Sequence, residues 1–345
     1  MSSNGSSFKL DETTLFIFQS VHTSIFISVI YIIITAVNLV GNGLSMWLLL
    51  FRTRPKTPSI IFMIHLTITD LAVGAALPFQ IAYQLQGYDW KLGATMCSAL
   101  TLIFFTNMYC SVLTMMAIGI DRYLGIVRPM LFRATRERKS IAVISCLFMW
   151  ALVLSVLYPF MSSDLTFYVH ELGTITCFDM LKKNMLPNRP AWAAYIFTWQ
   201  FSLFFFPFFV TTFCYVSVIR KLAQDSKTVK KNRAKRLAFV VLMVFTFCFA
   251  PNSILLLSHT VLKLFYGKSL YIYYKLTLCF SCLNSCLDPF IYYFASKEFR
   301  HKLRQMINIP TLTSVDSMRM EHKESLYSTD YNCENQERER RSRRI

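Results

Sequence analysis

Long apolar blocks divide this sequence and constrain its fold more than any other feature. Seven of them can be marked, at roughly 25–50, 59–84, 95–127, 141–161, 191–219, 237–262 and 270–294. As a helix, each block is long enough to cross the ~30 Å hydrocarbon core of a bilayer. Only helices and closed barrels satisfy their backbone polar groups in lipid, and these runs lack the alternation of a barrel strand. The sequence therefore predicts an all-α membrane protein, a seven-transmembrane helix bundle.

Composition excludes several other classes of protein. Hydrophobic residues make up 54% of the 345 residues and charged residues only 16%, whereas a soluble domain carries about 25% charged residues. A soluble two-domain enzyme, a disordered chain and a fibre are thereby excluded. The net charge of +17 would favour nucleic acid as a partner of a soluble protein. Here the basic residues lie between apolar blocks, so we expect the lipid bilayer, and no nucleic acid, as their partner.

The placement of charge predicts the orientation of the bundle. The loops after the first, third and fifth blocks hold 16 Lys and Arg residues, and the alternate loops hold six. Because basic loops stay in the cytoplasm, residues 1–24 are expected to be extracellular and 25–294 to span the plasma membrane. Asn4 begins a glycosylation sequon on the outer side. Residues 295–307 have an amphipathic spacing that predicts a short eighth helix on the inner leaflet, and 308–345 predict a disordered cytoplasmic tail.

Two of the ten cysteines fall on the predicted outer side. Cys97 begins the third block and Cys177 follows the fourth, so both face the oxidising compartment and we expect a disulfide between them. Two free thiols are the alternative. Cys279, Cys282 and Cys286 form a stripe along the seventh block. They lack the second cysteine pair or the paired histidines of a zinc site, so core packing is the better interpretation.

Two carboxylates fall in the middle of apolar blocks, where ionisable groups are costly and point to a function. Asp70 lies in the second block and Asp288 in the seventh. With Asn107, Ser111 and Asn284 they could coordinate a small cation, since oxygen ligands suit hard cations, or they could share a proton. The alternative is one protonated, hydrogen-bonded carboxyl group with no ion.

Prolines inside the blocks favour a protein that changes shape. Each one removes a backbone hydrogen bond and kinks its helix, which creates a hinge. Five of them recur along the bundle, namely Pro78, Pro159, Pro207, Pro251 and Pro289.

The inner end of the third block carries Asp121, Arg122 and Tyr123. A charged pair at this boundary could be a mere interfacial anchor. Adjacent opposite charges followed by an aromatic residue, facing a loop with eight basic residues, instead predict a docking surface for a partner.

Together these residues resemble the rhodopsin-like (class A) G-protein-coupled receptors over about 25–307. The family's landmarks occur in order along the blocks, and the ordered set is very specific. They are Gly41-Asn42, Leu66 to Asp70, Cys97, Asp121-Arg122-Tyr123, Trp150, Pro207 with Tyr215, Phe245 to Pro251, and Asp288-Pro289-Phe290-Ile291-Tyr292. Within the family, Phe105 to Tyr109, Phe249 to Pro251 and Asp288-Pro289 are similar to the branch of metabotropic purinoceptors and lysophospholipid receptors.

The resemblance implies a receptor that binds an extracellular small molecule and activates a heterotrimeric G protein of the twelve/thirteen or inhibitory class. It implies that Arg122 inserts toward the C-terminus of the G-protein α-subunit and that Asp121 restrains it at rest. The other switch residues would be Tyr123, Tyr215, Phe249, Pro251, Pro289 and Tyr292, with Tyr215 and Tyr292 swinging inward to hold the open form. A sodium pocket would be lined by Asp70, Ser111, Asn284 and Asp288, with no other cofactor, and receptor kinases and arrestin would act on the tail.

Three positions depart from the family's pattern. Phe249 replaces the usual tryptophan before the sixth-block proline, so the side chain whose rotamer change accompanies activation in the family is smaller here. His65 replaces the usual asparagine of the second block, near Trp150. Lys231 lies where some relatives carry an acid that faces Arg122, so we expect that lock to be absent and basal activity to exceed that of an acid-bearing relative.

The outer halves of the blocks bear on the ligand. Amine receptors of the family use an aspartate in the outer third block, but Thr101 to Met108 contain no acid, which disfavours a cationic amine. Nucleotide receptors of the branch carry His-x-x-Arg or His-x-x-Lys where this chain has Ser253 to Leu256, so a phosphate loses its expected partner.

Basic and aromatic residues near the outer ends of the blocks predict an amphiphilic ligand. An anionic head group would form charge-assisted hydrogen bonds with the candidate cations Arg189, His259, Lys263 and Lys275. The apolar wall below them includes Phe104, Phe105 and Trp199. We therefore predict an acidic head with an apolar, lipid-like tail, and a nucleotide is the alternative. The other alternative is that neither set binds a ligand. The phenylalanines would then face lipid or the core, and the basic side chains would extend to the membrane surface.

A membrane transporter is the alternative from a different class. Inverted repeats or paired broken helices would favour it, and the sequence shows neither, with an odd number of blocks. An intramembrane hydrolase would need a metal motif such as His-Glu-x-x-His, which does not occur. Asp70 and Asp288 lack the glycines that surround a paired-aspartate protease, so the protein is not expected to be an enzyme.

Overall fold

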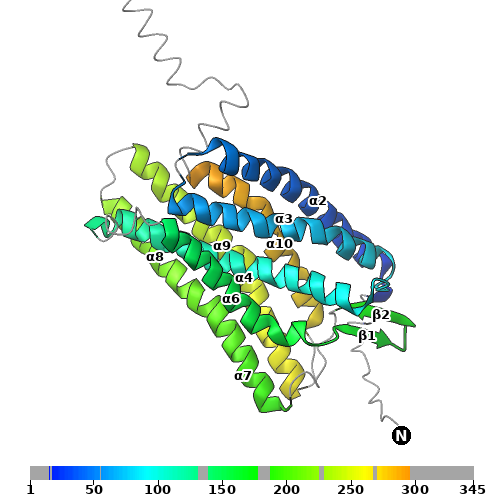
Figure 1. Ribbon diagram of the computed structural model, residues 1–345. Helices are drawn as coiled ribbons and strands as arrows, with labels where there is room; N and C mark the ends of the chain where they lie inside the picture. The colour runs from blue at the N-terminus through cyan, green and yellow to red at the C-terminus, as the bar shows by residue number, and fades with distance from the viewer. Residues whose placement is uncertain are drawn as a thin grey trace, which may run out of the picture. The chain divides into compact units, whose positions relative to one another are not determined.

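The computed structural model describes residues 15, 18–54, 56–130, 139–177, 187–224, 229–266 and 270–295. Its main element is a bundle of long helices, with a short β-hairpin at the end where α4 begins (Figure 1). In chain order the elements are α2 (Val21–Trp47), η1 (Leu48–Arg52), α3 (Pro58–Leu85), α4 (Gly93–Ile126), α6 (Lys139–Met161), β1 (Thr166–Val169), β2 (Thr174–Cys177), α7 (Arg189–Gln200), η3 (Phe201–Phe205), α8 (Phe206–Gln224), α9 (Val229–Val261), η4 (Leu262–Tyr266) and α10 (Tyr271–Ala295).

The predicted seven spans correspond to these helices. Within the described residues, six helical segments are long and apolar enough to cross a bilayer, and α7, η3 and α8 together form one of them. The seventh is α10, whose described apolar part covers 276–291. Asn4, the tail and residues 296–307 of the predicted eighth helix lie outside the described residues.

Polar residues at the block boundaries start three of the helices. Ser20 caps α2 by accepting a hydrogen bond from the Thr23 amide at 3.3 Å. Thr57 caps α3 directly before Pro58, and Asn188 caps α7 by accepting from the Ala191 amide at 2.8 Å. Such side chains satisfy amide groups that have no partner inside the helix. They fix where each span begins.

Prolines and π-helical turns interrupt the regular helices. Pro78, Pro159, Pro251 and Pro289 lie inside α3, α6, α9 and α10. Pro207 is the second residue of α8, directly after the π-helical segment η3. Both features remove or shift backbone hydrogen bonds and commonly mark functional positions. Among the five predicted hinges, Pro207 is the one that lies next to a π-helical segment in the described residues; bending at the other four stays a prediction.

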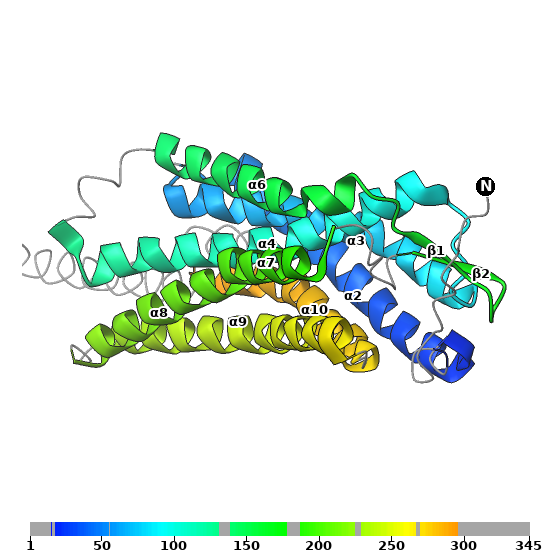
Figure 2. The ribbon, with the colours of Figure 1, turned by 90° about the horizontal axis from the view of Figure 1, so that it is seen from below.

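Helix α4 lies at the centre of the bundle. It packs against α3, α6 and α8 (Figure 2), and 72% of its apolar window is buried, compared with 28% for the peripheral α6. The cysteine stripe of α10 lies in a core cluster with Ile27 and Tyr31 of α2. Core packing of these cysteines is thus confirmed.

Candidate functional site

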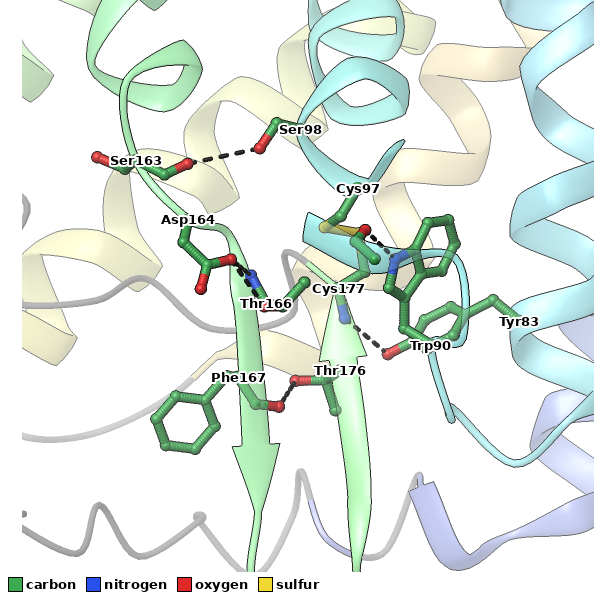
Figure 3. The surroundings of a disulfide bond; sticks show 11 residues. Tyr83, Trp90, Cys97, Ser98, Ser163, Asp164, Thr166, Phe167, Thr176 and Cys177 are labelled. Carbon is green, nitrogen blue, oxygen red and sulfur yellow. Dashed lines mark hydrogen bonds between the residues drawn. A yellow bond between two sulfur atoms is a disulfide. The ribbon is translucent and has the colours of Figure 1, made fainter. Parts of the chain in front are cut away.

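A disulfide fixes the hairpin to the end of the bundle. Cys97 at the start of α4 is bonded to Cys177 at the end of β2, with 5.7 Å between their Cα atoms (Figure 3). The expected pairing is therefore present. The Cys177 amide also donates to the Tyr83 hydroxyl at 3.3 Å, so β2 is attached to α3 as well as to α4.

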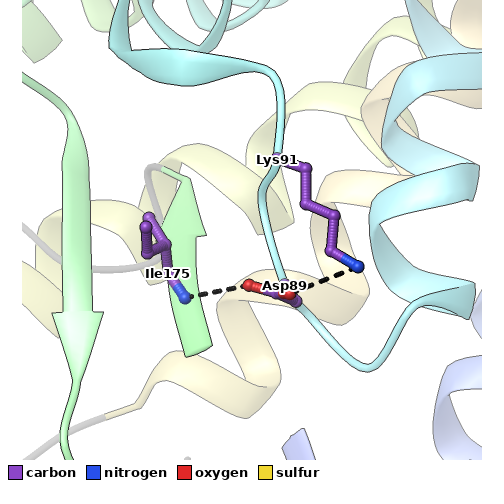
Figure 4. A network of polar contacts seen from close by, with 3 residues as sticks. All are labelled: Asp89, Lys91 and Ile175. Atoms are coloured by element: carbon purple, nitrogen blue, oxygen red, sulfur yellow. Dashed lines mark hydrogen bonds and ion pairs between the residues drawn. The ribbon is translucent and has the colours of Figure 1, made fainter. Parts of the chain in front are cut away.

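The loop between α3 and α4 holds the other side of β2. The Trp90 amide donates to the Ile175 carbonyl at 2.6 Å, and the Ile175 amide donates to Asp89 Oδ1 at 3.2 Å (Figure 4). Lys91 forms an ion pair with Asp89 at 3.6 Å. These contacts make the loop an added edge of the hairpin. They also hold the Trp90 ring at the rim of the cavity described next.

A cavity of about 700 Å³, including the space at its mouth, opens beside the hairpin. We call it the outer cavity. Its wall is apolar and aromatic with a few uncharged polar groups, and it includes Tyr31 of α2, Leu77 and Gln80 of α3, Trp90, Thr101, Phe104 and Phe105 of α4, Cys177, and Tyr274 and Leu278 of α10. This lining is typical of small-molecule sites, which are mostly apolar with a few polar groups.

The outer cavity contains part of the predicted ligand set. Phe104 and Phe105 line it, as the aromatic wall predicted. Sequence reasoning does not find Tyr31, Gln80 and Tyr274, because basic residues and phenylalanines are the more conspicuous groups at the outer block ends. A polar residue inside an otherwise apolar block is the signal that could have found them.

Trp199 and His259 have other surroundings in the structure. Trp199 packs behind Phe105, with 5.8 Å between the ring centroids, and does not line the outer cavity. His259 Nδ1 accepts from the Leu270 amide at 3.0 Å, and its ring stacks on Tyr274 at 6.2 Å. It thereby joins α9 to the start of α10. The side chains of Arg189, Lys263 and Lys275 lie outside the described residues.

The two buried carboxylates lie together in the middle of the bundle. Asn107 donates to Asp70 Oδ1 at 2.9 Å, and Asn284 donates to Asp288 Oδ2 at 3.1 Å. Both carboxyl groups are fully buried, and they interact with each other.

Each member of the expected sodium set has an oxygen without a hydrogen-bond partner among the described residues. These atoms are Asp70 Oδ2, Ser111 Oγ, Asn284 Oδ1 and Asp288 Oδ1. They come from α3, α4 and α10, all four are buried oxygen atoms, and two of them belong to carboxylates. This is the chemistry that a hard cation requires, so the residues present fit sodium.

A second cavity, of about 590 Å³, lies at the other end of α4. This inner cavity is lined by apolar residues together with Arg122 of α4 and Tyr215 of α8. The Tyr215 ring is buried and borders the same cavity as Arg122. Asp121, the expected restraint on Arg122, accepts a hydrogen bond from Ser59 Oγ of α3 at 2.5 Å.

The other switch residues pack around the same region. Tyr123 contacts Phe213 of α8 at 5.7 Å between ring centroids, and buried Phe249 contacts Phe245 at 5.5 Å. Pro289 packs against Gly41, where an added Cβ would lie 3.1 Å from Pro289 Cγ. The Tyr292 and Lys231 side chains lie outside the described residues.

The unusual histidine of the second span is accommodated by a polar contact. His65 Nδ1 lies 3.0 Å from Thr114 Oγ1 of α4, and its ring meets Trp150 of α6 edge-on at 6.1 Å. The expected proximity of His65 and Trp150 is present, and His65 thereby connects three helices.

Comparison with known proteins gives a family match over most of this bundle. The sequence matches the 7 transmembrane receptor (rhodopsin family) over residues 41–292. It is 49% identical over 333 residues to purinoceptor 8 of Gallus gallus, with 95% of this chain and 91% of the relative covered. A Homo sapiens protein named as an S-geranylgeranyl-glutathione receptor is 45% identical over 300 residues, with 86% of this chain and 83% of the relative covered.

Proteinase-activated receptors are also similar. Proteinase-activated receptor 2 of Rattus norvegicus is 36% identical over 318 residues, covering 91% of this chain and 79% of the relative. The resemblance to metabotropic purinoceptors is thus confirmed. The stretches that are similar to purinoceptor eight in particular are Met185 to Pro187, Leu264 to Ser269 and Lys275 to Phe294. The likeness to proteinase-activated receptors was not predicted.

Proposed function

The chain belongs to the rhodopsin family of seven-transmembrane receptors, and from this premise we propose that its ligand is an anionic amphiphile with an apolar tail. Membership makes it a multi-pass membrane receptor that binds an extracellular ligand and couples to a heterotrimeric G protein, and not an enzyme. The observation that carries the proposal is the outer cavity, whose apolar and aromatic wall suits a hydrocarbon tail.

The acidic head would bind at the outer ends of the last three spans. Arg189, Lys263 and Lys275 supply positive charge there in the sequence, and charge-assisted hydrogen bonds to an anion are about twice as strong as neutral ones. The name of the human relative supports this assignment, because S-geranylgeranyl-glutathione joins an isoprenoid chain to an acidic peptide. A nucleotide is not favoured, since Ser253 to Leu256 replace the basic motif that nucleotide receptors of the branch carry.

The finer partners follow from the same premise. The basic inner loops and the outer disulfide support an extracellular N-terminus and a cytoplasmic C-terminus at the plasma membrane. G proteins of the twelve/thirteen or inhibitory class would dock at the inner cavity, where Arg122 and Tyr215 meet. Receptor kinases and arrestin would act on the tail. Sodium would bind Asp70, Ser111, Asn284 and Asp288 and supply a positive charge between the two carboxylates.

A panel of G-protein dissociation sensors in cells tests the ligand class. The receptor is measured first without ligand, then with S-geranylgeranyl-glutathione and, separately, with ATP. We expect the prenylated peptide to activate it and ATP to have no effect; a response to ATP alone would contradict the proposal.

Lys275 provides a test of the head-group site. We expect Lys275→Ala to lower the potency of S-geranylgeranyl-glutathione about tenfold, because a charged hydrogen bond contributes roughly 1.5–3 kcal/mol. Lys91→Ala is the matched control, since Lys91 is an exposed outer lysine paired with Asp89. Unchanged potency of Lys275→Ala, measured at equal surface expression, would remove Lys275 from the site.

A further inference from the structure

Three uncharged polar side chains lie buried behind the outer cavity. Tyr109 is in α4, and Trp199 and Gln200 end α7; none is more than 3% exposed. The Tyr109 hydroxyl, the Trp199 indole N–H and both amide atoms of Gln200 have no hydrogen-bond partner among the described residues. We call these three residues the polar cluster.

The members of the polar cluster are neighbours. The Trp199 ring meets the Tyr109 ring edge-on, with 5.9 Å between centroids. The Gln200 and Trp199 side chains lie beside the Tyr109 hydroxyl, but no pair among these polar atoms has the distance and angle of a standard hydrogen bond. The polar cluster thus brings together the O–H of Tyr109, the N–H of Trp199 and the amide of Gln200, which can both donate and accept, and none of these groups has a hydrogen bond of standard geometry with another described residue.

Burying these polar groups without hydrogen-bond partners destabilises the folded state. Each buried polar group without a partner costs about 1–3 kcal/mol, and native proteins keep few of them. Departures of this kind are expected at functional sites, where a ligand supplies the missing partner.

The outer cavity reaches the polar cluster through one aromatic ring. Phe105 lines the outer cavity, and the same ring lies 5.8 Å from Trp199 and 6.3 Å from Tyr109, centroid to centroid. Phe105 therefore contacts both the outer cavity and the polar cluster.

The chemistry of the polar cluster selects a neutral partner. The groups that act on the Tyr109 hydroxyl within the described part of the chain are Gln200, Trp199, Tyr195 and Tyr274, all uncharged. A carboxylate or phosphate placed here would be a buried charge without a counter-ion, which is strongly unfavourable. An amide offers a carbonyl to the two donors and an N–H to the Gln200 oxygen.

We propose that the polar cluster binds an amide group of the agonist, located between its acidic head and its apolar tail. This assignment rests on the proposed function and adds a third contact to it. It selects lipid-modified peptides over simple lysolipids, which offer no amide at that position.

Conservative substitutions test the assignment through two separate measurements. Tyr109→Phe and Gln200→Leu remove only the unpaired polar atoms. For both we expect the potency of S-geranylgeranyl-glutathione to fall tenfold or more in the G-protein sensor assay. We expect the melting temperature of the ligand-free purified receptor to stay the same or rise, because a buried unpaired group has been removed.

Tyr195→Phe is the matched control. Its hydroxyl donates to the Val156 carbonyl at 2.8 Å, so its loss should lower the melting temperature and leave potency within twofold. A lower melting temperature with unchanged potency in Tyr109→Phe would make the polar cluster structural and overturn this proposal alone. A wild-type receptor that fails to respond to S-geranylgeranyl-glutathione would overturn the proposed function and this extension together.

Discussion

A single missing side chain determines where the Tyr215 ring lies. Gly119 of α4 is three residues before Arg122, and a Cβ built on it would be 3.2 Å from Tyr215 Cε2. That is closer than most side-chain contacts, so the ring would have to move. Because Tyr215 is buried and lines the inner cavity together with Arg122, Gly119 affects how this tyrosine is placed at the inner cavity.

We expect Gly119→Val to lower agonist-stimulated G-protein activation severalfold. The added methyl groups crowd the inward position of Tyr215, and overpacking typically costs about 1–3 kcal/mol. The measurement is maximal sensor response at equal surface expression. Gly43→Val is the control, since nothing lies within 4 Å of its Cβ position. In a Tyr215→Ala background Gly119→Val should add no further loss; a full additional loss would place the clash elsewhere.

At the scale of elements, the hairpin is held by contacts of unequal strength. Asp89 makes both an exposed ion pair with Lys91 and a hydrogen bond to the Ile175 amide. Exposed ion pairs contribute little, because solvent screens them. The hydrogen bond aligns the loop with β2, and its loss leaves the amide without this partner.

Two substitutions at Asp89 separate these contributions. Asp89→Asn keeps an oxygen acceptor and removes the charge, so we expect a melting temperature close to that of the wild type. Asp89→Ala removes both the acceptor oxygen and the charge. We expect it to lower the free energy of unfolding by about 0.5–1 kcal/mol, which corresponds to a melting temperature lower by roughly 1–4 °C. Equal destabilisation by the two variants would show that the ion pair dominates.

The long elements could be predicted from hydropathy, and the short ones could not. Seven apolar blocks and the caps Ser20, Thr57 and Asn188 define the spans through local sequence. The π-helical segment η3 contains buried Phe204, whose ring contacts Phe208 of α8, and no local pattern predicts this segment. The pairing of β2 with the loop at Trp90 is likewise a tertiary contact between distant segments.

For the molecule as a whole, the carboxylate pair lies where ligand and G protein can influence each other. Asp70 and Asp288 join α3 to α10, and Ser111 brings in α4. These helices contribute to both the outer and the inner cavity. A cation held here more tightly in one arrangement of the helices shifts the population of the whole receptor toward that arrangement.

We therefore expect sodium to reduce agonist potency. Replacing sodium chloride with choline chloride at constant ionic strength should raise the potency of S-geranylgeranyl-glutathione severalfold on the wild type. Asp70→Asn should abolish this difference, because it removes charge from the oxygen set. Asp164→Asn, a change of the same type at an exposed outer position, should retain it. Persistence of the sodium effect in Asp70→Asn would exclude this site.

The candidate site was only partly accessible from sequence. Residue type identified Asp70, Asp288, Cys97 and Cys177, because each is unusual at its place in the membrane topology. The location of the outer cavity between α2, α3, α4 and α10 follows from how helices pack, and separate hydropathy blocks do not contain that information. Trp199 is likewise expected in the ligand wall, whereas in the structure its ring packs against Phe105 and does not line the outer cavity.

Helix α4 contributes a residue to the disulfide, to both cavities and to the buried oxygen set. Cys97 anchors the hairpin, Phe105 lines the outer cavity, Ser111 offers an oxygen to the cation and Arg122 lines the inner cavity. From Cys97 to Arg122 the helix rises about 38 Å, and one inserted residue would turn everything beyond it by about 100°. Substitutions in this stretch can therefore be tolerated, but an insertion or deletion of one residue would rotate the residues of the inner cavity away from their present positions relative to the outer cavity.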